Sequence, residues 1–350
     1  MTISSDTLLA GPQGREFCWM LLWGAMPDAD YPEWSAVWNA VYGEGLSGHA
    51  DDLSACVGYA RPGLAAMDDR LMLTAFGRAV DAAAYWQERD HSLDGDEVRD
   101  ALLPLAELIV QSPATRWWDD PVARHAQMIV EREETGPPKL AGAAQGLAKW
   151  RADTESSEQQ AFREQPHDPS AQLTGHWWST PVGSGVPTTT RDLPGAGAVG
   201  LGLVEDGLGW SSARSWPVSP SPDARVYEVT SPDSWAALVG RFPLDVSYSR
   251  RHDWWRVTGL SGRWLIPDYQ AVAAEYDGIH VSAAAYLSAA GRPVAVGDGR
   301  TMLAGWDPDE TFWLADVLEI TGSPQVWEGD GQDAGAWHPS ARQWLRGEPG

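Results

Sequence analysis

Cysteine is nearly absent from this chain, and its scarcity limits the redox and metal chemistry open to the protein. Among 350 residues only Cys18 and Cys56 occur, outside any Cys-x-x-Cys spacing and away from histidine. Zinc sites built on cysteine need such spacings, so we predict no metal site. Two buried thiols in a reducing compartment are the expected state of this pair, and a structural disulfide between them is the alternative.

Long apolar runs are also missing, which argues against a membrane protein. The stretch from Cys18 to Trp23 is apolar but far too short to cross a bilayer. The first six residues carry none of the positive charge that opens a secretory signal. We therefore expect a cytoplasmic protein with no membrane partner.

Positive charge is scarce as well. Lysine and arginine together number 25 against 49 aspartates and glutamates, which gives a formal net charge of −24. Phosphate backbones are bound by dense cationic surfaces, so this balance argues against a general nucleic-acid-binding role. A hydrophobic content of 43% is that of a globular protein, and the chain is long enough for two ordinary domains.

Tryptophan, by contrast, is in excess. The chain has 21, and three times they occur as adjacent pairs, at 117–118, 177–178 and 254–255. The first two pairs share the frame Trp-Trp-x-x-Pro. Tryptophan supplies large amphipathic contacts, both in cores and in binding sites. The segments around these pairs are therefore the first places to look for function.

The first 130 residues have a helical pattern and a strong negative charge. They hold 20 acidic residues against 8 arginines, a net charge of −12. Apolar spacing and acidic starts predict helices over 33–42, 68–87 and 96–111, with Pro104 as a kink or break in the last, and another over 121–134. We therefore predict an acidic, all-α domain over residues 1–135.

The rest of the chain divides into a linker, a mixed domain and a tail. A polar linker with a helix near 139–163 is predicted over residues 136–175, an α+β domain over 176–327, and a Gly/Asp-rich tail over 328–350. Strands are predicted at 198–205, 224–230, 263–266, 279–282 and 311–318, and helices at 231–239 and 267–275. The predicted fold class is α+β, with a mostly antiparallel or mixed sheet in the C-terminal domain.

Segment 241–263 is a locally basic stretch, about +3, within this acidic protein. Arginine forks bind phosphate or carboxylate, and indole rings stack on bases, so the segment suits an anionic, partly aromatic ligand. The predicted ligand-binding residues are Arg250, Arg251, His252, Trp254, Trp255 and Arg256. The alternative is that these arginines pair with the excess acids while the tryptophans fill the core.

A second candidate site is the segment from His176 to Pro181. Its Ser-Thr pair follows two tryptophans at the end of a predicted strand. We predict that Trp178 and Thr180 bind a ligand, the hydroxyl by a hydrogen bond, and that Ser179 is a candidate nucleophile. The alternative is an ordinary strand end followed by a turn.

The third candidate lies in the segment from Gly305 to Trp313. Asp307, Asp309 and Glu310 gather carboxylates at one turn, where they could act as a general base or orient a ribose hydroxyl. Glu310 and Asp309 are the predicted catalytic acids, and a solvated acidic turn is the alternative. His280, beside a strand, is expected to be a hydrogen-bonded structural residue. The glycine-rich stretch 195–200 lacks the following helix and the distal acid of a dinucleotide-binding fingerprint.

Two resemblances bear on the C-terminal half. The strings Arg-Val-Tyr-Glu-Val, Tyr-Asp-Gly-Ile-His-Val-Ser and Gly-Trp-Asp-Pro-Asp-Glu-Thr-Phe-Trp resemble a pattern in uncharacterised actinobacterial proteins. The order arginine, Ser179-Thr180, then a late acid is similar to the layout of ADP-ribosyltransferases. That resemblance implies an NAD site supported by the Ser-Thr pair and a ribose-orienting role for Asp309 or Glu310. Pro181 stands where that family has another serine.

Together these observations favour a nucleotide- or NAD-binding, transferase-like C-terminal domain. A non-enzymatic module that docks a protein partner through acidic and tryptophan-rich surfaces is the first alternative. A small-molecule tailoring or self-resistance enzyme with an aromatic pocket is the second. The expected ligand is a small anionic or aromatic molecule.

Overall fold

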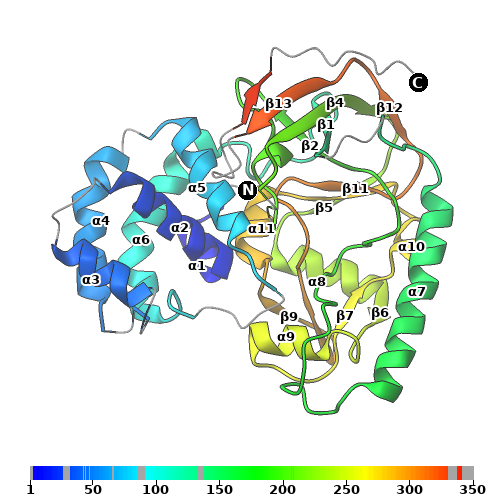
Figure 1. The fold of residues 1–350 in the computed structure, drawn as a ribbon, viewed down its shortest axis with the longest axis horizontal. Helices are drawn as coiled ribbons and strands as arrows, with labels where there is room; N and C mark the ends of the chain where they lie inside the picture. The colour runs from blue at the N-terminus through cyan, green and yellow to red at the C-terminus, as the bar shows by residue number, and fades with distance from the viewer. Residues whose placement is uncertain are drawn as a thin grey trace.

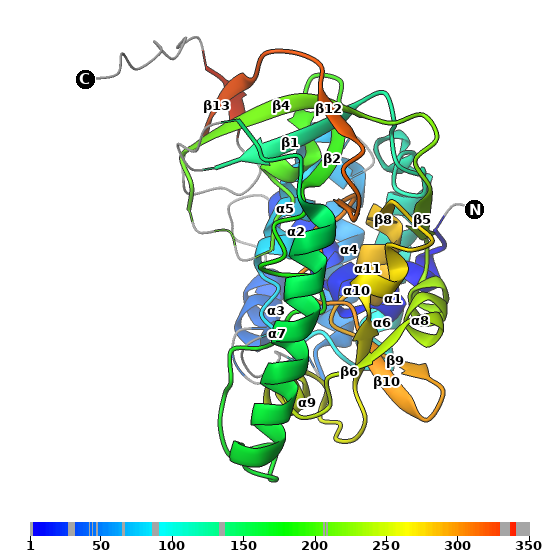
Figure 2. The ribbon, with the colours of Figure 1, turned by 90° about the vertical axis from the view of Figure 1, so that its right-hand side faces the viewer.

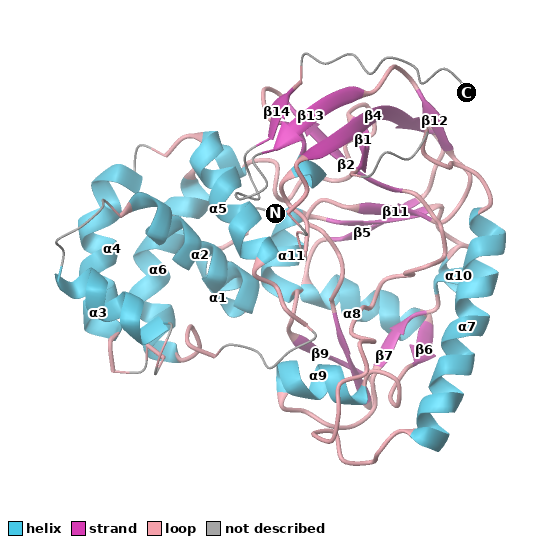
Figure 3. Cartoon of the chain, viewed as in Figure 1, coloured by secondary structure: helices cyan, strands magenta, loops and turns pink. Residues whose placement is uncertain are grey.

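The computed structural model of the chain describes residues 3–26, 32–41, 43, 45–46, 48–64, 67–85, 91–132, 137–205, 207, 209–329 and 337–340. Helices fill the N-terminal part, and a large mixed sheet with further helices fills the C-terminal part (Figures 1 and 3). The predicted α+β class is therefore confirmed.

Six helices form the N-terminal part. They are α1 (Ser5–Ala10), α2 (Pro12–Ala25), α3 (Pro32–Val41), α4 (Ala50–Leu64), α5 (Asp69–Asp81) and α6 (Asp96–Gln111). Helix α2 is apolar over most of its circumference, because the other helices surround it. Helix α5 begins where the Asp68 carboxylate accepts a hydrogen bond from the Leu71 amide at 2.8 Å. Helix α6 continues through Pro104 without a break.

The helix predicted over 121–134 is wrong. Residues Gln127–Glu131 form strand β1, which pairs antiparallel with strands β2 and β4. The burial of Gln127 and Ile129, with Met128 between them half-buried, follows the two-residue period of a strand. Pro121 and the turn after it start the segment in a non-helical conformation.

A ten-stranded sheet organises the C-terminal part. Its strands are β1, β2 (Thr188–Leu193), β3 (Gly197–Ala198), β4 (Ser212–Pro220), β5 (Val226–Val229), β8 (Gly278–Val281), β11 (Thr311–Trp313), β12 (Leu318–Ile320), β13 (Gln325–Gly329) and β14 (Trp337–Pro339). The main order is β14-β13-β4-β1-β2-β11-β8-β5. Among the described strands only β5 and β8 pair in parallel, so the prediction of a mostly antiparallel or mixed sheet is confirmed.

Two of the predicted strands differ from the structure. The strand predicted at 198–205 ends after Ala198, and a short 3-10 helix, η2 (Val199–Leu201), follows. Thr190 packs against Gly200, whose amide donates to the threonine hydroxyl at 2.9 Å, so the chain bends here instead of extending. The strand predicted at 311–318 splits into β11 and the start of β12. Two further strands, β13 and β14, lie in and beside the predicted tail.

Helices and two small hairpins complete the C-terminal part. The helices are α7 (Ala143–Glu164), α8 (Pro232–Arg241), α9 (Arg251–Thr258), α10 (Tyr269–Val272) and α11 (Ala283–Ala289), with a one-turn 3-10 helix, η1 (Pro113–Thr115), before the sheet. The hairpins pair β6 (Pro243–Asp245) with β7 (Leu265–Pro267) and β9 (Pro293–Val296) with β10 (Gly299–Met302). Helix α7 runs along one side of the molecule, below strands β1 and β4 in the view of Figure 2. It confirms the helix predicted near 139–163.

Helix α11 joins the two parts. It is buried along its whole length and packs on α1 and α2 from one side and on α8 from the other. A β-carbon at Gly11, between α1 and α2, would lie 2.2 Å from the carbonyl oxygen of Leu287, so only glycine allows this close approach. One continuous cluster of buried apolar residues therefore runs from the helical part into the sheet part.

Both cysteines are free and buried, as expected. Burial raises the pKa of the Cys56 thiol to about 11, so it stays protonated at neutral pH. In the described part of the chain, no helix has the length and apolar composition needed to cross a membrane.

Candidate active site

Segments 177–180 and 304–305 lie against each other, so two of the three predicted regions meet directly. The Ser179 amide donates to the Ala304 carbonyl at 2.8 Å, and the Ser179 hydroxyl bonds both backbone groups of Ala304 at 3.0 Å. The Tyr269 hydroxyl donates to the Ser179 carbonyl at 2.7 Å. Ser179 is fully buried, and its hydroxyl therefore joins two loops inside the protein. The segment is irregular, not the strand that was predicted.

Thr180 presents an unused hydroxyl at the same place. Its Oγ1 atom is buried and bonds no residue that the structure describes. A β-carbon at Gly305 would lie 3.4 Å from that oxygen and 3.1 Å from the Trp178 β-carbon. Gly305 also has a φ of +79°, so glycine is required here for both space and backbone conformation.

Helix α9 holds the segment before these residues. Each of its basic residues, and Arg250 at its N-cap, bonds a backbone carbonyl of segment 166–178. The pairs are Arg250 Nε to Trp178 (3.1 Å), Arg251 Nη1 to Pro166 (2.5 Å), His252 Nδ1 with Pro169 (2.9 Å), Trp254 Nε1 to Trp177 (2.6 Å) and Arg256 Nη2 to Ser170 (3.2 Å). The predicted ligand-binding residues of α9 thus position the second candidate segment.

The predicted ligand-binding residues of segment 250–256 differ in how deeply their side chains are buried. Arg250, His252 and Trp254 are buried, whereas Arg251, Trp255 and Arg256 are half-buried. Burial lowers the pKa of Arg250 to about 10, and its guanidinium also lies over the Trp178 ring, 5.7 Å from the centroid. Trp254 packs edge-on against Trp264 at 5.1 Å. Arg250 and Trp254 of this segment are therefore part of the protein core.

A buried carboxylate that the sequence did not single out, Glu205, lies beside Gly305. Its Oε1 accepts hydrogen bonds from the hydroxyls of Tyr85 at 2.9 Å and Tyr286 at 2.8 Å, and its Oε2 accepts the Gly305 amide at 2.7 Å. Tyr85 comes from the helical part and also contacts the Trp177 ring, with centroids 5.7 Å apart. Both parts of the chain therefore contribute to this site.

Asp307 and Glu310 extend the carboxylate cluster. Asp307 accepts the Glu205 amide at 2.8 Å, and Glu310 accepts the Asp307 amide at 3.1 Å. Burial, together with the charge of Asp307, raises the pKa of Glu205 to about 8 and the pKa of Glu310 well above its usual range. Burial also raises the pKa of Asp307, which is half-buried and is the most accessible of the three. The cluster therefore retains protons at neutral pH.

Arg132 faces this cluster. Its Nη2 donates to the Gly200 carbonyl, and its guanidinium lies over the Trp210 ring at 4.9 Å. The charges of Asp307 and Glu310 favour its cationic form, although burial lowers its pKa. Its Nε atom is buried and bonds no described residue. A cation and an indole are thus placed next to carboxyl groups whose pKa values burial raises.

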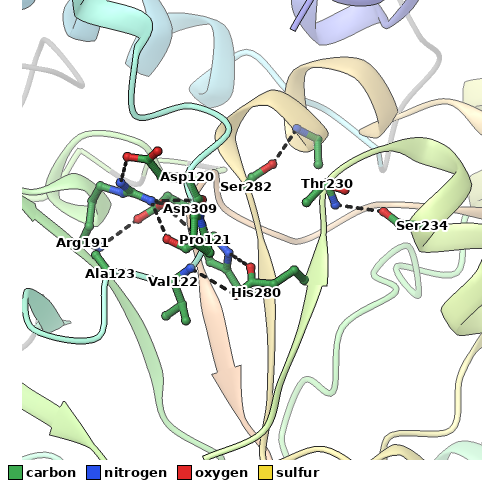
Figure 4. Close-up of polar contacts among 12 residues, drawn as sticks. Asp120, Pro121, Val122, Ala123, Arg191, Thr230, Ser234, His280, Ser282 and Asp309 are labelled. Carbon is green, nitrogen blue, oxygen red and sulfur yellow. Dashed lines mark hydrogen bonds and ion pairs between the residues drawn. The ribbon is translucent and has the colours of Figure 1, made fainter. Parts of the chain in front are cut away.

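Asp309 belongs to a charged chain with Arg191 and His280 (Figure 4). It accepts the Arg191 amide at 2.9 Å and the Arg191 side chain at 2.7 Å. Arg191 also binds the carboxylate and carbonyl of Asp120, both at 3.3 Å, and lies over the Trp117 ring at 5.3 Å. The first Trp-Trp-x-x-Pro frame, which carried no predicted chemistry, therefore anchors Arg191.

His280 continues this chain between two carboxylates. Its Nε2 lies 3.2 Å from Asp309, and its Nδ1 lies 2.6 Å from Glu228, which also accepts the Val122 amide at 3.2 Å (Figure 4). Burial disfavours the charged ring, but the hydrogen bonds to Asp309 and Glu228 prevail and raise the pKa of His280 to about 9. His280 is thus hydrogen-bonded at both ring nitrogens, and through Asp309 it contacts the turn that carries Asp307 and Glu310.

The candidate active site therefore combines predicted and unpredicted residues. Segments 176–180, 250–256 and 304–310 converge, but Glu205, Tyr85 and Arg132 join them from places that no motif marked. One available signal was Glu205 itself, the first of two adjacent acids that follow an uncharged run, 193–204. Among the described residues, no group of three histidine, cysteine or acidic side chains has the arrangement of a metal site.

No protein-family model matches this chain, and no curated protein or solved structure is significantly similar to it.

Proposed function

We propose that the carboxyl cluster of Glu205, Asp307 and Glu310 is the acid–base centre of a group-transfer enzyme acting on a nucleotide-type substrate, with NAD as the first candidate. The observation that carries this proposal is the gathering of three carboxyl groups with raised pKa values in one hydrogen-bonded network. Carboxyl groups tuned toward neutral pH are characteristic of general acid–base sites.

The reaction assigns different roles to the three acids. In transfer from NAD, the bond from the ribose C1′ to nicotinamide breaks, and neutral nicotinamide leaves with the bonding electrons. The acceptor hydroxyl or amine forms a bond to C1′ and gives its proton to Asp307, the most accessible carboxylate. Glu310 and Glu205, whose pKa values burial raises further, stay protonated beside it. Asp309, bound to Arg191 and His280, is a positioning residue in this scheme.

The surroundings of the cluster suit such a substrate. The half-buried rings of Trp177 and Trp178 offer faces for a base or nicotinamide ring, and the unused Thr180 hydroxyl can bond a ribose or amide. Arg132 supplies positive charge for a phosphate. These contacts support a small anionic, partly aromatic ligand. We propose that the enzyme works in the cytoplasm, where its two thiols remain reduced.

Calorimetric titration with NAD tests the binding step. The wild type is expected to bind, and Arg132→Ala is expected to weaken binding about tenfold or more, because a charge-assisted phosphate contact is lost. Arg116→Ala removes an exposed arginine outside the cluster and serves as the matched control. Absence of binding by the wild type would reject NAD as the ligand, and equal affinity in both variants would reject Arg132 as its phosphate contact.

A protein partner is the second candidate function, favoured by one observation in the helical part. Trp23 is 38% exposed and Tyr59 is 50% exposed in the helical part, whose overall charge is negative, whereas the other described tryptophans are buried or half-buried. A basic protein or peptide would fit this face. Protamine binding measured by anisotropy should weaken in Trp23→Ser but not in Phe162→Ser, an exposed aromatic on α7; unchanged binding in both would remove this alternative.

A further inference from the structure

We infer that a cavity separate from the carboxyl cluster binds a nucleoside-type ligand. The cavity, of about 340 Å³, lies between the start of α5, the β2–β3 turn, η2 and strand β14. Its volume is within the range of small-molecule sites. None of Glu205, Asp307 and Glu310 lines it, so the inference does not depend on the chemistry proposed for them.

The walls favour a flat ring. The β2–β3 turn and η2 contribute mainly glycine and alanine, and a β-carbon at Gly195 would meet nothing within 4 Å. One face of the Trp337 ring rests on Gly329, and the same indole lines the cavity. Leu73 and Leu203 add apolar surface. A planar heteroaromatic ring can therefore stack on the indole against a wall of backbone.

The polar groups suit the rest of a nucleoside. The amide of Gly195 donates to no described residue, so it can bond the edge of a base. Arg70 and Asp69 both line the cavity and are exposed, and Arg70 forms no ion pair with any described residue. A carboxylate such as Asp69 accepts ribose hydroxyls, and a free guanidinium such as Arg70 binds phosphate. His338 is a further polar group at the cavity.

Adenosine is the first probe, titrated into the full-length protein by calorimetry. Leu73→Trp places a large ring in the cavity and is expected to weaken adenosine binding at least tenfold. Leu173→Trp makes the same change at an exposed loop residue and should bind as the wild type does. Trp337→Ala removes the stacking face without filling the space and should also weaken binding. It keeps the test valid if Leu73→Trp fails to fold.

Adenosine 5′-monophosphate is the second probe. It should bind more tightly than adenosine, and Arg70→Ala should remove that advantage. Arg132→Ala and Asp307→Asn should leave adenosine binding unchanged. No adenosine binding, or binding that survives Leu73→Trp and Trp337→Ala, overturns the inference. Binding that is lost only in Arg132→Ala would place adenosine at the carboxyl cluster and likewise overturn it, while supporting the proposed function.

Discussion

Asp309 adopts a backbone conformation that few residues other than glycine accept. Its φ is +62°, the one positive value among the described non-glycine residues. The carboxylate compensates for this strain by binding the Arg191 amide and side chain and the His280 ring. The same turn carries Asp307, which accepts the Glu205 amide, and Glu310, which accepts the Asp307 amide. The strained residue therefore lies in the turn that carries two of the proposed acid–base groups.

Substitutions at Asp309 separate backbone strain from charge. Asp309→Asn keeps a residue that tolerates positive φ but leaves Arg191 and His280 without their shared anion, which should cost about 3 kcal/mol. Asp309→Ala loses both features and should be less stable still. Urea unfolding of both variants measures the difference. Equal stability of Asp309→Ala and the wild type would show that this charged chain does not hold the turn.

Glu205 should make stability fall as the pH rises. Its pKa is about 8 in the folded protein against an ordinary 4.5, so between these values the folded state keeps a proton that the unfolded chain releases. The free energy of unfolding therefore decreases with pH across this window, by about 1.4 kcal/mol per pH unit at most for this group. Glu205→Gln cannot titrate and should flatten the decline.

Urea unfolding at a series of pH values from 5 to 9 measures this slope. Glu319→Gln changes an exposed glutamate on β12 and should keep the wild-type slope. His280, with a folded pKa of about 9 against 6.5, adds stability that is complete below pH 6.5 and is lost up to pH 9, and both variants retain it. A Glu205→Gln slope equal to that of the wild type would contradict the raised pKa.

Some helices could be predicted from their local sequence, whereas others depend on contacts with distant parts of the chain. Helix α8 was predictable because a recognisable sequence pattern marks its N-terminus: Ser231 and Ser234 form a capping box, and Pro232 lies in the first turn. Helix α9 was not, since its eight residues include two arginines, a histidine and an aspartate and show no clear apolar period. Its side chains bind the carbonyls of a distant segment, and no local pattern encodes that partner.

The role of α9 predicts unequal effects at two neighbouring arginines. Arg250→Ala removes a buried guanidinium and leaves the Trp178 carbonyl without its donor, which should cost about 2–3 kcal/mol. Arg251→Ala removes a half-buried side chain whose acceptor, the Pro166 carbonyl, can bind water, and should cost under about 1 kcal/mol. Thermal or urea unfolding compares them. A larger loss in Arg251→Ala would contradict the positioning role of Arg250.

At the scale of the whole molecule, the two parts of the chain share one core. The sequence predicted the helical and mixed halves from composition and periodicity. It could not predict that buried α11 would pack between them, or that Tyr85 would reach Glu205 across the boundary. Such contacts join residues more than a hundred positions apart, and no local pattern in a single sequence indicates that two such distant residues meet.

This shared core predicts cooperative unfolding. Scanning calorimetry of the full chain should show one transition, because unfolding either part exposes apolar surface of the other. Two well-separated transitions would show instead that the helical and mixed parts are independent units.

We propose that Asp307 and Glu310 perform acid–base chemistry on a nucleotide, and the release of nicotinamide from NAD is the decisive measurement. Chromatography should detect nicotinamide with the wild type, whereas Asp307→Asn and Glu310→Gln should release at least a hundredfold less while still binding NAD. Asp223→Asn, at an exposed turn, should retain the wild-type rate. Equal release by the wild type and both cluster variants, or no release by a wild type that binds NAD, would contradict the claim.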